Sequence, residues 1–299
     1  MAKRIFFAAS AFILCAGMLF SNKALAQSRL KVITTLFPQY DFARAICRDK
    51  ADVYLLIPPG VEPHEYEPKP SDIVKINQAD VFIFTNPYME PWAAGIVKGI
   101  SPKRLMVINA SKDVKFIKSA QGIVDPHVWL DLSNAKVMVK NIADALIAKD
   151  PKNAEFYQTN AEEYNKKLDG IDNRFRDELG RCRKGVFISA GHSTFGYFAK
   201  RYGLTYLCGY TGYSPDSEPT PRAVMELIRD AKKNGLKYVY YEELLSPKLA
   251  QTIAQEAGAG TLSLNGAHNV SKKDLDSGVT FLSIMEENLV NLKKGLECN

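Results

Sequence analysis

The residues of this sequence best suited to chemistry are its four histidines, and each stands in a turn-rich or strand-end context. Imidazole is the side chain that most often binds borderline metal ions, and histidines far apart in a chain can converge in the folded protein. Their spacing is not a short metal-binding motif, so four unrelated polar loop residues would explain it equally well. The histidines are His64, His127, His192 and His268.

The elements that must position these histidines alternate between apolar strands and amphipathic helices, which predicts an α/β fold with mostly parallel sheets. The expected strands are 30–37, 53–57, 81–84, 105–108, 186–189, 205–207 and 238–241. The expected helices are 40–47, 71–78 with Ser71 as N-cap, 91–97, 133–149 with Ser133 as N-cap, 194–201, 222–234, 246–258 and 278–296.

The segment 153–179 differs from the rest because Gly170 is its only helix-breaking residue. Its apolar residues recur at three- and four-residue steps, which predicts one amphipathic helix on the order of 40 Å long. Such a helix can connect two domains, and about 270 residues is long for a single core. We expect an N-terminal lobe at 27–150, a rigid linker helix at 151–181 and a C-terminal lobe at 182–299.

The predicted map places the histidines at strand ends. His64 and His192 follow expected strands, and His127 lies between Pro126 and Val128. Ligands of open α/β sheets bind outside the carboxyl ends of the strands. His64 and His127 belong to the first lobe, whereas His192 and His268 belong to the second. A site built from all four must therefore lie in the cleft between the lobes.

The first 26 residues have the features of a secretory signal peptide: a basic start, a mostly apolar run over 5–20 and an A-x-A pattern ending at Ala26. A membrane anchor is the weaker alternative because the run is short for a span. Lipid attachment at Cys15 is also weaker, because the bulky Leu14 precedes it. Cleavage near Ala26 removes three basic residues and no acids, so the formal charge falls from +6 to +3.

Charge and cysteine content limit the partners and predict one covalent link. The bases are interspersed with acids, so we expect no nucleic-acid partner, and we expect a monomer. An exported protein can form disulfides, and a bridge between Cys182 and Cys298 is our hypothesis because they end two helices. Cys47 is expected to be a small core residue, and Cys208 is left unassigned.

Three phrases resemble the metal-binding solute-binding proteins of zinc and manganese ABC importers. The phrases are Pro63-His-Glu-Tyr-Glu-Pro68, Asp125-Pro-His-Val-Trp-Leu-Asp131 and Gly191-His-Ser-Thr-Phe195, and both Glu218-Pro219 and the segment 285–289 also match. The resemblance covers residues 29–297. It implies two α/β lobes joined by a rigid helix, in agreement with the pattern of elements.

The resemblance also implies a ligand set. His64, His127 and His192 match the first three ligands of the family. The fourth family ligand is an aspartate in a Leu-Asp-Pro-Leu phrase, which here reads Leu264-Asn-Gly-Ala267, so the aspartate is absent. His268 could fill this position, and the amide of Asn265 is a poorer alternative.

Metal-bound histidines usually donate their second N–H to a carboxylate or a carbonyl. Glu242 follows a strand at a place where the family also has glutamate, so it is our main candidate for such a partner. Asp131 and Glu65 are further candidates. For any single acid, a solvated surface position is an equally good explanation.

Ligand type indicates the metal. Three or four nitrogen ligands in a tetrahedral arrangement favour Zn²⁺ over Mn²⁺, which prefers more oxygen. Zinc importers often carry a histidine-rich loop between the first two ligands, but the segment 111–123 contains no histidine. We therefore expect zinc without that auxiliary capture loop.

Several other functions compete with this one. A manganese- or iron-type receptor of the same family would use the same fold. A zinc hydrolase would need an open coordination position and a general base, and Pro68 stands where an H-E-x-x-H motif would need histidine. A surface adhesin would need an anchor, and a siderophore or vitamin receptor would not need clustered histidines. We expect a periplasmic protein, not an enzyme, that captures zinc and passes it to the membrane permease of an ABC importer.

Overall fold

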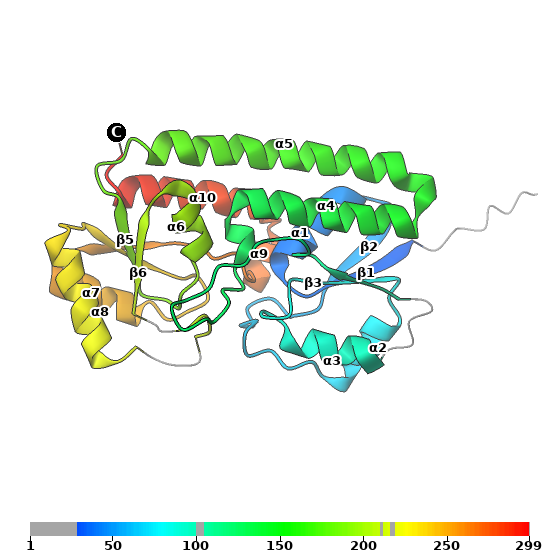
Figure 1. Ribbon diagram of the computed structural model, residues 1–299, viewed down its shortest axis with the longest axis horizontal. Coiled ribbons are helices and arrows are strands. Elements are labelled where there is room, and N and C mark those ends of the chain that lie inside the picture. Colours follow the sequence, from blue (N-terminus) through cyan, green and yellow to red (C-terminus); the bar gives the residue numbers. More distant parts are fainter. Residues whose placement is uncertain (1–28, 100–104, 210–211, 216–218, 299) are drawn as a thin grey trace, which may run out of the picture.

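The computed structural model describes residues 29–99, 105–209, 212–215 and 219–298, and it contains two separate parallel sheets (Figure 1). The predicted signal peptide and Glu218, the first residue of the Glu218-Pro219 pair that matches the family pattern, lie outside the described residues. The first sheet consists of β1 Leu30–Thr34, β2 Ala51–Leu55, β3 Val81–Phe84 and β4 Met106–Asn109, and the second of β5 Val186–Ser189, β6 Thr205–Cys208, β7 Tyr238–Tyr241 and β8 Gly260–Ser263.

Both sheets have the same topology. Their strand orders are β2-β1-β3-β4 and β6-β5-β7-β8, and every strand pair is parallel. All four residues of β3 are buried and apolar, as expected for a parallel strand covered on both faces. The predicted α/β class with parallel sheets is therefore confirmed.

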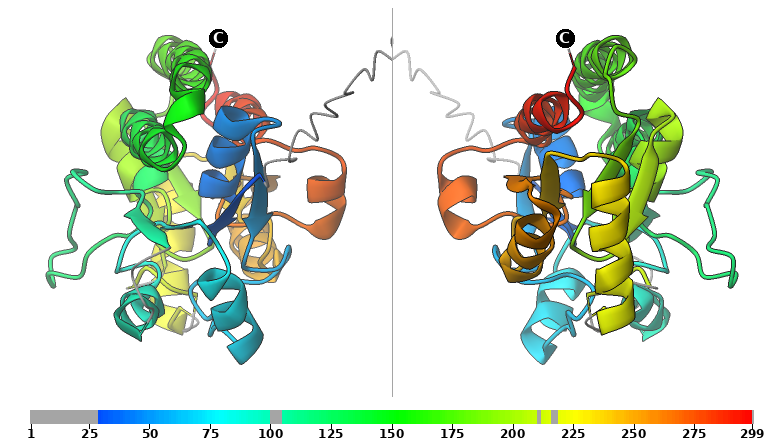
Figure 2. Two further views of the ribbon diagram at one scale, coloured as in Figure 1. Left: turned by 90° about the vertical axis from the view of Figure 1, so that its right-hand side faces the viewer. Right: turned by 90° about the vertical axis from the view of Figure 1, so that its left-hand side faces the viewer.

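Helices cover both faces of the two sheets. They are α1 Phe37–Cys47, α2 Pro70–Asn77, α3 Pro91–Gly99, α4 Leu132–Lys149, α5 Ala154–Leu179, α6 Gly196–Tyr202, α7 Pro221–Lys233, α8 Lys248–Ala257, α9 Lys272–Asp276 and α10 Phe281–Gly295, with short 3₁₀ turns at Val128–Leu130 and Pro151–Asn153. Both end views show α4, α5 and α10 running together along one side of the molecule (Figure 2).

One hydrophobic core extends across both sheets. It combines one face of β1 and β3, one face of β5 and β7, and the apolar sides of α1, α4, α5, α6 and α10. Each sheet has a smaller core on its opposite face, under α2 and α3 in the first sheet and under α7 and α8 in the second. Because the largest core is shared, the sheets are held together by packing as well as by the chain connection.

Helix α5 joins the two halves, as predicted. Its buried residues follow the three- and four-residue steps of one helical face, including Tyr157, Tyr164, Leu168 and Phe175. The 26 residues of α5 correspond to about 39 Å at the helical rise. The division into lobes at residues 150 and 182 remains our proposal.

Several predicted helix starts were wrong by a few residues. Helix α4 begins at Leu132, so its N-cap is Asp131 and not Ser133. The Asp131 carboxylate accepts from the backbone N–H of Ser133 at 2.8 Å. Helix α2 begins at Pro70, with Lys69 and not Ser71 at the N-cap position. Proline is favoured in the first turn, where its missing N–H costs no hydrogen bond.

The predicted disulfide and the predicted buried position of Cys47 are both present in the structure. Cys182 follows α5 and forms a disulfide with Cys298, which follows α10. Cys47 is fully buried in the main core. The disulfide therefore ties the end of the connecting helix to the end of the chain.

Reduction of this disulfide is expected to lower the free energy of unfolding. The bridge closes a loop between residues 116 positions apart, and native bridges of this kind contribute about 2–4 kcal/mol. Urea titrations with and without reductant would measure the difference. The Cys298→Ser variant should unfold at the reduced midpoint and should not respond to reductant. An unchanged wild-type midpoint after complete reduction would contradict this role.

Candidate metal centre

The four histidines, which come from both sheets, lie together in the structure. His64 follows β2, His192 follows β5, His268 follows β8, and His127 precedes the 3₁₀ turn before α4. One ring nitrogen of each lies within 4.8 Å of the corresponding atoms of the others. The carboxyl ends of the strands thus bring the side chains to one point between the sheets.

The spacing of the nitrogens fits a tetrahedral ion. His127 Nε2 lies 3.1 Å from His64 Nε2 and 3.3 Å from His192 Nε2. Zn–N bonds of about 2.0–2.1 Å place two nitrogens of a tetrahedral site about 3.3 Å apart. These two separations are close to those that a single zinc ion would require.

Burial is deepest on the side of the cluster away from His64. His127 and His192 are fully buried and His268 is almost so, whereas His64 is partly exposed. Nε2 of His268 has no hydrogen-bond partner among the described residues. A buried ring nitrogen without a partner is costly, which is consistent with a site made to receive a ligand.

A carboxylate stands behind each of the two most buried imidazoles. Asp125 Oδ1 lies 2.8 Å from Nδ1 of His127 and also accepts from its backbone N–H at 3.0 Å. Glu242 Oε2 lies 3.0 Å from Nδ1 of His192. In both cases Nε2 is left facing the other histidines. This carboxylate–histidine arrangement orients metal ligands in proteins.

Sequence reasoning had chosen Glu242 and missed Asp125. The signal for Asp125 was available, because it lies two residues before His127 in the same quoted phrase. Gly191 is also required here, because a Cβ at that position would overlap the Glu242 side chain. Glu62 was missed as well; its Oε1 accepts from the backbone N–H of His64 at 3.0 Å.

Three of the histidines are held neutral by their surroundings. Burial, together with a smaller effect of the neighbouring His192, lowers the pKa of His64 to about 3. Burial and the adjacent imidazoles hold the pKa of His127 and of His268 well below the usual range. Metal ions bind neutral imidazole, so these rings are already in the binding form near neutral pH.

One histidine of the cluster and one carboxyl group behind it hold protons more strongly than usual. Burial alone would lower the pKa of His192, but the charge and contact of Glu242 outweigh it, and the net shift is upward. Burial raises the pKa of Asp125 to about 8. A cation at the cluster would favour the deprotonated form of both groups, so metal and protons compete here.

Other predicted candidates lie outside the cluster. Asp131 caps α4 and pairs with Arg201 at 2.8 Å, so it does not support a histidine. The Asn265 side chain accepts from the backbone N–H of Ala267 at 2.7 Å. Glu65 is exposed. The contacts of Asp131 and Asn265 are thus with the structure around the site.

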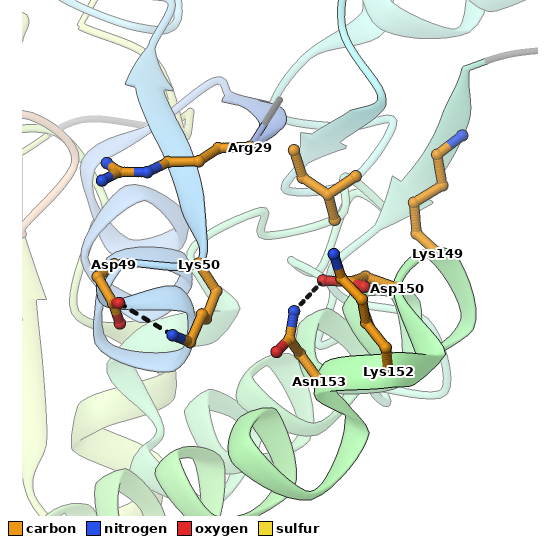
Figure 3. Close-up of a pocket in the computed structure, with 8 residues that line it drawn as sticks. Arg29, Asp49, Lys50, Lys149, Asp150, Lys152 and Asn153 are labelled. Atoms are coloured by element: carbon orange, nitrogen blue, oxygen red, sulfur yellow. Dashed lines mark hydrogen bonds and ion pairs between the residues drawn. The ribbon is translucent and has the colours of Figure 1, made fainter. Parts of the chain in front are cut away.

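A separate cavity of about 200 Å³ lies at the opposite ends of the strands in the first sheet (Figure 3). It lies near the starts of β1 and β2, and its four basic side chains outnumber its two acidic ones, Asp49 and Asp150; the basic residues are Arg29, Lys50, Lys149 and Lys152. A basic lining does not suit a metal cation, so this cavity is not part of the metal centre.

Comparisons with known proteins agree with this geometry. The family described as zinc-uptake complex component A, periplasmic, matches residues 32–295. The high-affinity zinc uptake system protein ZnuA of Bacillus subtilis is 38% identical over 293 residues, covering 92% of this chain and 91% of that protein.

Two solved structures have the same fold. The metal-dependent lipoprotein YcdH of Bacillus subtilis has a TM-score of 0.81 at 41% identity, over 90% of this chain and 100% of that one. The Zn(II)-bound ZnuA-like domain of Streptococcus pneumoniae AdcA has a TM-score of 0.80 at 35% identity, over 90% and 100% of the two chains. This chain therefore belongs to the family of periplasmic zinc-uptake components, which are solute-binding proteins and not enzymes.

Proposed function

We propose that this protein captures Zn²⁺ outside the cytoplasmic membrane and delivers it to the permease of an ABC importer. The observation that carries the proposal is the convergence of four imidazoles whose nitrogens lie within 4.8 Å of one another, with two of the pairs at tetrahedral spacing. His64, His127, His192 and His268 are the proposed ligands, and zinc is the cargo. Family membership and the zinc-bound relative support this assignment.

The charge around the cluster is suited to a divalent cation. Four neutral imidazoles leave the full charge of the ion uncompensated, and burying an unpaired charge is costly. Asp125 and Glu242 lie directly behind two of the rings, so two carboxylates can balance the ion when both are deprotonated. Mn²⁺ would find no oxygen ligand among the four groups, which disfavours the manganese-type alternative.

The hydrolase alternative is also disfavoured. A catalytic zinc site keeps one position open for water, whereas four protein ligands complete a tetrahedron. Binding and release of the ion suit such a site better than catalysis does.

Export is part of the proposal. We infer cleavage of the signal peptide near Ala26, in a segment outside the described residues. Across the described ranges, no helix has both the length and the apolar character needed for a membrane span. A monomer without a nucleic-acid partner, docked transiently on its permease, remains our expectation.

Removal of a proposed ligand should weaken zinc binding far more than removal of a neighbouring amide. His127→Ala should reduce zinc affinity by more than about 100-fold, since changes to groups behind a ligand already cost about 10–100-fold. Asn265→Ala is the matched control and should cost much less. Chelator competition on the metal-stripped mature protein measures both. The reverse ranking would contradict the assignment.

The preference for Zn²⁺ over Mn²⁺ tests whether His268 is the fourth ligand. The wild type should select Zn²⁺ over Mn²⁺ in competition, with bound metal quantified by mass spectrometry. His268→Ala should lose most of that selectivity and affinity, because three nitrogens remain. Tight zinc binding that is unaffected by this change would exclude His268 as a ligand.

Zinc affinity should fall as the pH is lowered from 7.5 to 5. The pKa of His192 is raised, so the metal-free protein keeps that proton to higher pH, and zinc must displace it. Asp125, with its pKa near 8, adds a second proton. The other three rings are already neutral, so calorimetry in buffers of different ionisation enthalpy should show at most two protons released, and not four.

Glu242→Gln should reduce that proton release by about one, because it removes the charge that raises the pKa of His192. Release of four protons by the wild type would mean that the buried rings start out charged. An affinity that is flat over this pH range would rule out histidine ligation altogether.

A further inference from the structure

The loop that carries His268 adopts a strained conformation. Ala267, the residue before it, has φ of 56°, in the left-handed region that costs a residue with a Cβ about 1–2 kcal/mol. A Cβ at Gly266 would lie 2.5 Å from Cε1 of His268 and 2.9 Å from Cγ2 of Thr194. The imidazole is therefore pressed against the Gly266 backbone, and the loop needs outside contacts to keep this shape.

Contacts from the second lobe, to which the loop belongs, hold the start of the loop. The backbone N–H of Asn265 donates to Asn288 Oδ1 at 2.8 Å, and Asn288 Nδ2 donates back to the Asn265 carbonyl at 2.8 Å. Asn288 lies on α10, so this pair ties the loop to the C-terminal helix.

Contacts from the first lobe hold the middle and end of the loop. Trp129 Nε1 donates to the Gly266 carbonyl at 2.8 Å, and the backbone N–H of Phe37 donates to the His268 carbonyl at 3.1 Å. The N–H of Gly60 donates to the Val270 carbonyl at 2.8 Å. The loop is therefore bonded across the cleft although its strand belongs to the second sheet.

Asn269 makes the most direct link between two of the proposed ligands. Its Nδ2 donates to the carbonyls of Pro58 at 2.8 Å and Val61 at 3.0 Å, and its Oδ1 accepts from the N–H of Val270 at 2.9 Å. Pro58 and Val61 form the turn that leads to His64, whereas Asn269 directly follows His268. Asn269 is 1% exposed, so its amide is shielded from water although Pro58 and Val61 are exposed residues.

We propose that Asn269 is a positioning residue that sets the separation of His64 and His268 across the cleft. This inference rests on the proposed function, because it assigns a role in zinc binding to a side chain that does not contact the ion. Both N–H donors and the oxygen of its amide bond to backbone groups, so we assign the amide to positioning and not to the ligand set. Ligand geometry must be held to within about 0.5 Å for tight binding, and no other single side chain among the described residues bonds to both loops.

Two substitutions and a matched control test the role. Asn269→Asp keeps the shape and the acceptor but loses both donated bonds, and Asn269→Ser shortens the side chain without adding charge. Asn160→Ala is the control: this amide is also buried and donates to a backbone carbonyl, that of Ile46 at 2.9 Å, in the packing of α5 on α1.

Zinc affinity is measured by chelator competition, ligand geometry by the visible spectrum of the Co²⁺-loaded protein, and stability by urea denaturation. Both Asn269 variants should bind zinc about 10–100-fold more weakly than wild type, in the range seen for groups behind metal ligands. Their cobalt bands should lose the intensity of a four-coordinate site. Asn160→Ala should unfold at lower urea but retain wild-type affinity and spectrum.

The outcomes separate this inference from the proposed function. Wild-type affinity and cobalt spectrum in both Asn269 variants would overturn the positioning role while the wild type still binds zinc. An equal loss in Asn160→Ala would overturn it too, because affinity would then follow overall stability. Failure of both Asn269 variants to fold would assign the residue to the fold and not to the site. Absence of zinc binding by the wild type would instead refute the proposed function.

Discussion

The structure depends on one demand: four imidazole nitrogens from distant parts of the chain must be held within bonding distance of one point. The rings cannot do this alone, because three of them are almost fully buried and their loops end strands of two different sheets. The shared core under α1, α4, α5, α6 and α10 fixes those sheets relative to each other. Precision at the metal centre thus comes from packing that extends through both halves of the molecule.

The electrostatics of the centre follow from the same burial. Removing water keeps His64, His127 and His268 neutral, and it would also make an isolated dication expensive. Asp125 and Glu242 lie behind the rings, where their negative charge can neutralise an ion without coordinating it. They therefore lower the cost of burying a dication. The groups that receive the metal and the groups that balance its charge are therefore different residues, and Asp125 and His192 hold their protons more strongly than usual when the ion is absent, because the pKa of each is raised.

Much of this arrangement could be predicted from the sequence, because it rests on local patterns. Continuous apolar runs such as 81–84 indicated buried parallel strands, the apolar stripe of 154–179 indicated the connecting helix, and the strand-end rule indicated where the histidines would meet. Which side chain each acid contacts could not be predicted from the local sequence. Asp131 and Asp125 lie in the same phrase, but only the folded chain shows that Asp131 faces Arg201 and Asp125 faces His127. The role of Asn269 depends on a turn more than 200 positions away.

The cross-cleft bonds also constrain how the lobes can move. Rigid separation of the two sheets would break the bonds from Trp129, Phe37 and Asn269 to the opposite lobe and would expose the apolar side chains of the shared core. Each such bond contributes about 0.5–1.5 kcal/mol, and the apolar surface adds more. His64 is the least buried of the four rings, but the turn before it is held by the bonds from Asn269. Movement of the His64 loop would therefore also break bonds between the lobes, so all four proposed ligands are held by contacts that extend beyond the site.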